Sequence, residues 1–517
     1  MGWMSGTGGI RMFPRIDSYI SRTSDGVVSG TTSAAVPIAI PTATDASTAQ
    51  PITEGSKPVP ARRRLNSLDA FRGSTVALRI IIGSQVAEMA APALLHANGF
   101  GLTLADLVFP GFLFIMGMAV PVSMSAFLRP SAVHDPGRPY RRPHVLRIAR
   151  RALLLYAIGM FLNAFPFPPG VWEHLRFVGV LQRLAVVYLV VSLLYLTCAW
   201  SMLPVTRPVS SERKVATPAG DARTRVVRLL VRAFLLGGFP LVCVAVWIVA
   251  TFTFHSPWAE CADAHALVPN CSLQAYVDTS AWGVEHNYDG AKFDPEGLVS
   301  TLVALVNCWA GLVVGMDIVR NKRRYQVIAG VRRRASLLIT SGVMCVGFGL
   351  VLGLVIPIGK HLWTPSYALV TIGIMTAGFG LALLAFDGGL WPLPPRPADG
   401  GRSGGGHRLR SWFPYFGGSV TAAVRRGLVP VGDTLVALGR NPLFFYILSE
   451  LVITTLGSLP VRYDGKEGSA WSVGAEVGLA SWMPGPLASI VWALLWLLLF
   501  YVPLARLLAA RGWYIRV

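Results

Sequence analysis

A histidine and an aspartate ten residues apart carry the strongest chemical signal in this sequence. His96 ends one long apolar stretch and Asp106 opens the next, within LLHANGFGLTLADLVFPGFLFIMG. A histidine titrates near neutral pH, and a carboxylate can orient it for proton transfer. Ionisable groups at the ends of membrane spans mark functional sites by default, because their burial near hydrocarbon is costly. The alternative is a hydrated interfacial loop in which neither group needs a partner.

The segments that position this pair read as membrane-spanning helices. Of the residues, 53% are hydrophobic and 14% are charged, and the mean hydropathy is +0.53. Long apolar runs recur along the whole chain, each near the roughly 20 residues that cross a bilayer as a helix. The sequence predicts an all-α polytopic membrane protein with about ten transmembrane helices. The spans are expected near residues 72–95, 104–127, 145–165, 176–203, 227–254, 296–319, 334–358, 364–386, 431–459 and 485–510.

The net charge of +20 is distributed as a topological signal. Basic residues crowd alternate loops, within 138–151, 207–225, 320–334 and 396–426, and the intervening loops are nearly free of Lys and Arg. Cytoplasmic loops of membrane proteins carry such an excess. The pattern predicts that both termini lie in the cytoplasm. It also explains the net charge by insertion in a lipid bilayer, so no nucleic-acid partner is expected.

The rest of the chain divides by composition. Residues 1–61 are rich in Ser, Thr, Gly and Pro and are expected to form a disordered N-terminal tail, followed by a transmembrane domain over 62–517. A flexible cytoplasmic loop is expected over 388–428. The outward loop 255–295 is acidic and holds Cys261 and Cys271, which either form a disulfide in an oxidising compartment or remain free thiols.

Several familiar chemistries have no motif in this chain. There is no GxxxxGK[ST] loop, no GxSxG nucleophile elbow between a strand and a helix, and no HExxH helix, which argues against a nucleotide-driven pump, a serine hydrolase and a zinc protease. No Cys/His cluster has zinc spacing, so no metal is expected.

Polar groups from several predicted spans fall at one depth, near the outer membrane face. With His96 and Asp106, this layer comprises Gln182, Arg183, Asp294, Glu296, Trp363, Ser366 and Tyr367. Such a layer favours a cavity that opens outward. The alternative for Arg183 is a structural pair with Asp294 or Glu296 that holds helices together. A polar cavity also suits a transporter, so catalysis and transport are not separated at this point.

Two further polar positions interrupt apolar spans. Arg79 is expected in the inner half of the first span, where it either snorkels to the cytoplasmic headgroups or meets an anionic ligand. Asn441 stands before Pro442 in LGRNPLFFY, and an opened turn there would line a cavity.

An ordered set of motifs carries a family resemblance. The motifs are RLNSLDAFRGSTVAL (64–78), HANGFGLTLADLVFPGFLFIMG (96–117), GVLQRLAVVYL (179–189), FDPEGLVSTL (293–302), LWTPSYALVT (362–371) and LGRNPLFFYILSE (438–450). Together they resemble the catalytic membrane domain of the heparan-α-glucosaminide N-acetyltransferase family and its bacterial relatives. The resemblance covers about residues 62–517.

The resemblance implies transmembrane acetylation. Acetyl-CoA would bind as co-substrate from the cytoplasmic side, and the acetyl group would reach an amino sugar or glycan on the other side. The family's catalytic histidine maps onto His96, and its motif positions near the reaction centre include Asp106. CoA phosphate partners would be Arg79, Arg147 and Arg150, although these arginines also read as topology signals. The family implies a homodimer and an integral multi-pass protein, in a bacterial inner membrane or, in a eukaryote, a lysosomal or other endomembrane.

Two mechanisms and two other functions stay open. His96 would act as a nucleophile that forms an acetyl-imidazole, or as the general base that deprotonates the acceptor. The other functions are a transporter or flippase of a sugar-bearing or acylated molecule, and a membrane acyltransferase that acts on polysaccharide hydroxyls. Two positions depart from the family's pattern. Gly83 occupies the place of an asparagine that the family usually has close to its catalytic histidine, and Arg79 occupies a generally apolar place.

Overall fold

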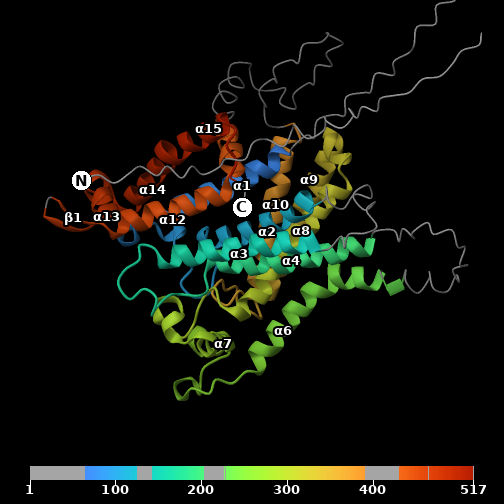
Figure 1. Ribbon diagram of the computed structural model, residues 1–517, viewed down its shortest axis with the longest axis horizontal. Coiled ribbons are helices and arrows are strands. Elements are labelled where there is room, and N and C mark those ends of the chain that lie inside the picture. The colour runs from blue at the N-terminus through green and yellow to red at the C-terminus, as the bar shows by residue number, and fades with distance from the viewer. Residues whose placement is uncertain are drawn as a thin grey trace, which may run out of the picture. The chain divides into compact units, whose positions relative to one another are not determined.

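The structure is a computed structural model that describes residues 65–124, 142–202, 226–227, 229–389, 430–463 and 465–515. The predicted tail 1–61 lies outside these residues, as does the predicted loop 388–428 apart from its first two positions. The described part is built mainly from helices (Figure 1). The long helices are α1 (Asn66–Gly83), α2 (Val108–Met124), α3 (Arg142–Ala164), α4 (Val180–Met202), α6 (Phe239–Thr253), α8 (Leu298–Arg320), α9 (Ile328–Gly353), α10 (Pro365–Phe386), α12 (Pro442–Ser458), α14 (Gly485–Trp496) and α15 (Val502–Ala510).

Within the described residues, seven helices are long and apolar enough to cross a membrane, and a bent pair raises the number to eight. They agree with eight of the ten expected spans to within a few residues. The bent pair, Pro430–Arg440 and Pro442–Ser458, turns by 87° at the irregular entry expected at Asn441. The other two expected spans contain the helices α1 and α3, whose charged residues keep them below the composition of an apolar span.

The helix found in the first expected span is shorter than the apolar run of the sequence. Helix α1 ends at Gly83, and the chain continues through the short 3₁₀ turns η1 (Ala87–Met89) and η2 (Pro92–Leu94). The polar Ser84 and Gln85 follow the glycine, and Pro92 cannot continue a helix. As a result, His96 lies in an irregular loop between α1 and the 3₁₀ turn η3 (Ala105–Leu107) that leads into α2, and not at the end of a span.

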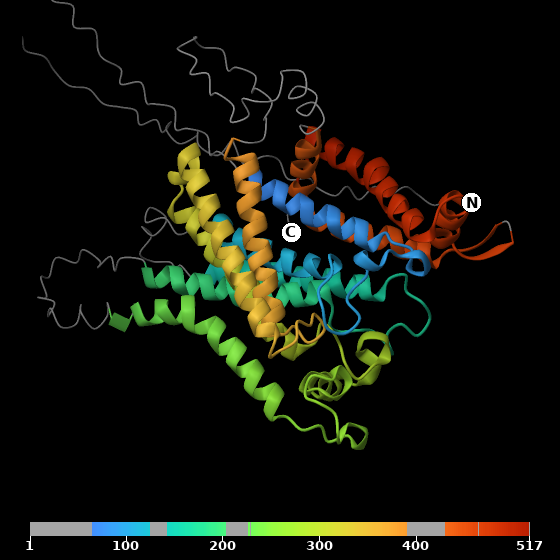
Figure 2. The same ribbon diagram turned by 180° about the vertical axis from the view of Figure 1, so that it is seen from behind.

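Helices α2 and α8 pack backbone to backbone. A β-carbon on Gly311 or Gly315 would meet the carbonyl oxygen of Phe114 or Met118, and one on Gly117 would meet that of Cys308. Small residues four apart allow this approach, as in membrane helix pairs. Helix α10 packs in the same manner along α9, and α3 packs along α4 (Figure 2). The resulting framework fixes the positions from which α2 and α8 begin.

The connections at one end of the bundle carry smaller elements. The outward loop contains α7 (Leu273–Trp282) and the 3₁₀ turns η6 (Ala259–Cys261), η7 (Pro269–Cys271), η8 (Val284–His286) and η9 (Tyr288–Gly290), and Cys261 and Cys271 form a disulfide there. After α12, an antiparallel hairpin of β1 (Pro460–Tyr463) and β2 (Lys466–Ser469) leads into α13 (Ala470–Ala475). The remaining elements are the 3₁₀ turn η10 (Arg324–Gln326) and the π-helical turns η5 (Phe234–Gly238), η11 (Glu476–Ala480) and η12 (Leu497–Tyr501).

Candidate active site

His96 and Asp106 form a direct pair. The Nδ1 atom of His96 lies 2.8 Å from Oδ1 of Asp106, while the side chains are 51% and 1% exposed, respectively. A buried carboxylate that accepts the Nδ1 proton leaves the lone pair on Nε2, at the open edge of the ring. An imidazole held in this way is suited to accept a proton or to attack a carbonyl carbon.

Asp106 is held rigidly by the loop that carries the histidine. Its Oδ2 atom accepts hydrogen bonds from the backbone N–H of Ala97 at 3.2 Å, and from the N–H and hydroxyl of Thr103 at 3.0 Å each. The hydroxyl of Tyr367, at the start of α10, donates to the Asp106 carbonyl at 2.6 Å. These bonds fix the carboxylate, and the carboxylate in turn fixes the imidazole.

Lys360 is a third member of this group and was missed by the sequence analysis. Its Nζ atom lies 2.9 Å and 3.2 Å from Nδ1 and Nε2 of His96, and 3.6 Å from Oδ1 of Asp106. Burial lowers the pKa of Lys360 below its usual value, against the opposing charges of Glu296 and Asp106. One signal was available, because a lysine in an outward connection is an exception to the charge pattern that set the topology.

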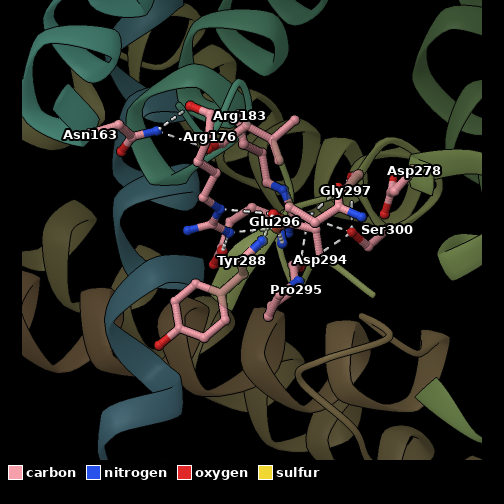
Figure 3. Close-up of polar contacts among 12 residues, drawn as sticks. Asn163, Arg176, Arg183, Asp278, Tyr288, Asp294, Pro295, Glu296, Gly297 and Ser300 are labelled. Atoms are coloured by element: carbon pink, nitrogen blue, oxygen red, sulfur yellow. Dashed lines mark hydrogen bonds and ion pairs between the residues drawn. The ribbon is translucent and has the colours of Figure 1, made fainter. Parts of the chain in front are cut away.

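A second polar group lies where the outward loop enters α8 (Figure 3). Arg176 binds Asp294, with 2.8 Å between Nε and Oδ2, and also pairs with Glu296. Burial alone lowers the pKa of Arg176, but the bond to Asp294 and the two carboxylate charges outweigh it and raise that pKa above its usual value. The guanidinium also lies 4.9 Å from the ring centroid of Tyr288.

Arg183 does not take the partners expected for it. Its Nη2 atom donates to the carbonyl oxygens of Pro295 at 2.8 Å and Gly297 at 3.2 Å, and to the Ser300 hydroxyl (Figure 3). Arg176 holds both carboxylates, so the alternative of a direct pair between Arg183 and Asp294 or Glu296 is wrong for the described residues. The Nε and Nη1 atoms of Arg183 have no hydrogen-bond partner there.

The aromatic residues of the predicted layer join the two groups. The Trp363 ring lies 5.0 Å from the Arg183 guanidinium, and its indole N–H donates to Asn307 at 3.0 Å. Its φ of 50° is in the left-handed region, which costs a non-glycine residue energy and often occurs at functional sites. Ser366 donates to the Pro357 carbonyl at 3.1 Å and supports the same connection.

Two predicted residues point elsewhere. The Gln182 amide lies against Met160 of α3, with 3.7 Å between Nε2 and Sδ. Asn441 binds the C-terminal segment, with its Nδ2 3.0 Å from the Trp513 carbonyl and its Oδ1 2.9 Å from the Ile515 amide. Asn441 thus joins the bend before α12 to the C-terminal segment, and its side chain is satisfied by backbone groups there.

Arg79 lies in the second half of α1, four residues before its last residue Gly83. It pairs with Glu450 of α12, and its guanidinium lies 5.4 Å from the Tyr446 ring centroid. A β-carbon on Gly83 would occupy the position of Arg79 Nη1. Neither a headgroup nor a phosphate is therefore needed as its partner.

A small basic pocket lies at the other ends of α2 and α4. Arg147, Arg151 and His144 of α3 line it together with Tyr188 and Ser123. The Arg151 guanidinium lies 5.5 Å from the Tyr188 ring centroid. Arg150 is exposed and does not line this pocket.

In the part of the chain that the structure describes, no cluster of three or more His, Cys, Asp and Glu side chains has the arrangement of a metal site.

Comparison with known proteins gives one consistent result. Residues 64–216 match the family described as heparan-alpha-glucosaminide N-acetyltransferase, catalytic. The chain is 29% identical over 337 residues to the heparan-alpha-glucosaminide N-acetyltransferase of Homo sapiens, covering 59% of this chain and 46% of that protein. For the protein of that name from Mus musculus the identity is 26% over 355 residues, covering 62% and 49%. The chain thus spans about half the length of the curated relatives it matches.

Proposed function

We propose that this chain, which belongs to the heparan-alpha-glucosaminide N-acetyltransferase family, is a membrane-embedded enzyme that transfers an acetyl group from acetyl-CoA to the amine of an amino sugar or glycan. The observation that carries the proposal is the His96–Asp106 pair. Its half-exposed imidazole is bound through Nδ1 to a buried carboxylate that accepts three further hydrogen bonds. This arrangement serves acyl transfer, in which a neutral imidazole must act at Nε2.

His96 has two possible tasks in this reaction. As the nucleophile, it attacks the thioester carbon through Nε2 and carries the acetyl group to the acceptor. As the general base, it takes a proton from the acceptor amine while that amine attacks the thioester directly. Asp106 supports both tasks, because it holds the tautomer and stabilises the positive charge that develops on the ring.

The direction of transfer follows from the two ends of the bundle. The basic pocket of Arg147 and Arg151 suits the phosphates of CoA, and it lies near the end of α2, about 25 Å along that helix from Asp106 at 1.5 Å per residue. The charge pattern assigns the pocket end to the cytoplasm, together with both termini. Acetyl-CoA would enter there, and the acceptor would approach His96 from the other side. A bacterial inner membrane fits this arrangement.

The proposal is tested with purified protein in detergent. Release of free CoA from acetyl-CoA is measured with glucosamine as the acceptor, for the parent protein, His96→Ala and the control His265→Ala in the outward loop. The parent and the control should release CoA at similar rates, and His96→Ala should be slower by about 10²-fold or more. Undiminished release by His96→Ala would remove the role of His96. Absence of both CoA binding and CoA release in the parent would favour a transporter.

The two tasks of His96 are separated without an acceptor. Acetyl-CoA labelled in the acetyl group is mixed with the parent protein alone, and the protein is analysed for bound label. A labelled adduct that His96→Ala lacks supports the nucleophile, whereas its absence in an active enzyme supports the general base.

A further inference from the structure

We infer that Lys360 is a further catalytic residue of this site, and that its ammonium group protonates the sulfur atom that leaves from the thioester. The inference deepens the proposed function and rests on it. A thiolate that departs from a thioester must receive a proton to become the thiol of CoA. In the nucleophilic scheme neither His96 nor Asp106 supplies that proton, because Nε2 of His96 is bonded to the acetyl carbon when the sulfur leaves.

The position of Lys360 suits this task. The Nζ atom is nearly equidistant from the two ring nitrogens of His96, at 2.9 Å and 3.2 Å. The Nδ1–H bond, which points at Asp106, and the lone pair of Nε2 diverge in the ring plane, so a single Nζ this close to both nitrogens lies beside the ring and not along either direction. Any carbon that bonds to Nε2, and the sulfur attached to that carbon, would therefore come within reach of the ammonium group.

The surroundings of Lys360 favour a proton that can be given up. Its side chain is 15% exposed, and the charged groups that act on it are Glu296, Asp106 and Arg183, with His96 and His361 beside it. Burial is the largest influence and lowers its pKa, which eases loss of a proton. The Oδ1 atom of Asp106 lies 3.6 Å from Nζ, so the carboxylate attracts the ammonium group by charge at a distance longer than a hydrogen bond.

The proton balance closes over one turnover. In the nucleophilic scheme, Nε2 of His96 bonds to the acetyl carbon, the C–S bond breaks, and sulfur keeps the electron pair and takes a proton from Lys360. The acceptor amine then attacks the acetyl carbon, the bond to Nε2 breaks, and neutral Lys360 takes the proton that the amine loses. The products are CoA thiol and the acetylated amine, with both residues restored.

The general-base scheme closes in the same way. The amine attacks the thioester and gives its proton to His96, while Lys360 protonates the departing sulfur. The imidazolium then returns a proton to the neutral amine of Lys360 across their contact of about 3 Å.

A change of leaving group isolates this step. Two acetyl donors are compared with glucosamine as the acceptor: acetyl-CoA, whose alkyl thiolate needs a proton, and S-(4-nitrophenyl) thioacetate, whose thiolate is stable as an anion. The variants are Lys360→Met, which removes the amine, and Lys360→Arg, which keeps the charge but does not release its proton. Lys292→Met is the matched control, because Lys292 pairs with Glu260 in the same outward region. Thermal unfolding in detergent checks that each variant is folded.

With acetyl-CoA, both Lys360 variants should lose about 10²-fold or more in kcat. With the nitrophenyl donor they should keep a rate within about 10-fold of the parent, since no proton is needed for departure. Recovery of the acetyl-CoA rate in Lys360→Arg would overturn the inference in favour of a purely electrostatic role. Equal losses with both donors, or no loss, would also overturn it. A parent protein with no His96-dependent transfer from either donor would instead overturn the proposed function.

Discussion

The guanidinium of Arg79 occupies the space that a β-carbon on Gly83 would need. Arg79 reaches from there to Glu450 and the ring of Tyr446, so α1 and α12 are joined by an ion pair for which the missing side chain of Gly83 leaves room. Arg79 and Gly83 are thus parts of one local arrangement.

Gly83→Ala is expected to destabilise the protein, although alanine favours helices over glycine by about 1 kcal/mol. The new methyl group must displace the Arg79 side chain and weaken its pair with Glu450, at a net cost of about 1–2 kcal/mol. The midpoint of thermal unfolding in detergent should fall. In the background Arg79→Met/Glu450→Gln the same substitution should be neutral or stabilising, and an equal loss in both backgrounds would show that the two positions are independent.

Asp106→Asn is expected to lower kcat by about 10²–10⁴-fold with little change in stability. An asparagine can keep one oxygen on the Ala97 and Thr103 donors, but its amide would then face His96 and donate to Nδ1. That bond selects the tautomer with the proton on Nε2, which can neither attack nor accept a proton. Initial rates of CoA release measure the effect, and a kcat close to that of the parent would contradict the orienting role of Asp106.

Asp278 should make stability depend on pH. Burial raises the pKa of its carboxyl to about 7, and the negative charge of Asp294 adds to the effect against the hydrogen bond from the Leu298 amide. In the unfolded chain an aspartate titrates near 4, so between about pH 4 and pH 7 the folded protein binds the extra proton. The free energy of unfolding therefore falls as the pH rises through this window, by up to about 4 kcal/mol.

Asp278→Asn should remove this slope, and Asp263→Asn, an exposed change in the same loop, should keep it. The measurement is the thermal unfolding midpoint in detergent at a series of pH values from 4 to 8. An unchanged slope in Asp278→Asn would mean that other groups set the pH dependence.

Arg151→Ala is expected to raise the KM for acetyl-CoA by about 10-fold, with a smaller effect on kcat, because a phosphate contact in the basic pocket is worth about 1–3 kcal/mol. Arg323→Ala removes a charge from the connection between α8 and α9, outside the pocket, and serves as the control. Steady-state kinetics with varied acetyl-CoA checks the result. A parallel rise in both variants would indicate a general effect of net charge on acetyl-CoA.

The apolar runs predicted most of the helices. A membrane span needs an unbroken apolar stretch of about 20 residues, and such a stretch fits few positions in the sequence. They failed at α1, where the run continues through residues that cannot stay helical after Gly83. Within the site, the close contact of His96 and Asp106 agrees with their assignment as one unit. The sequence did not identify Arg176 as the partner of Asp294 and Glu296. Two arginines lie close together in the sequence, and side-chain packing, which residue spacing does not reveal, decides which one turns toward the carboxylates.

Lys360 and Glu450 were missed for a related reason. Each is distant in sequence from its partner, by 264 residues for Lys360 and His96, and nothing local indicates such a contact. Only the charge of Lys360, in a connection that the charge pattern predicts to be nearly free of Lys and Arg, gave a signal.

The backbone contact between α2 and α8 limits how the molecule can move. No layer of side chains separates Gly311 and Gly315 from α2, so a sliding movement between the two helices would press backbone against backbone. The loop that carries His96 leads into α2, and the polar group lies directly before α8, so both groups are attached to the same tightly packed helix pair. For the proposed acetyl transfer, a movement that admits a substrate would therefore have to come from the connections and the outer helices.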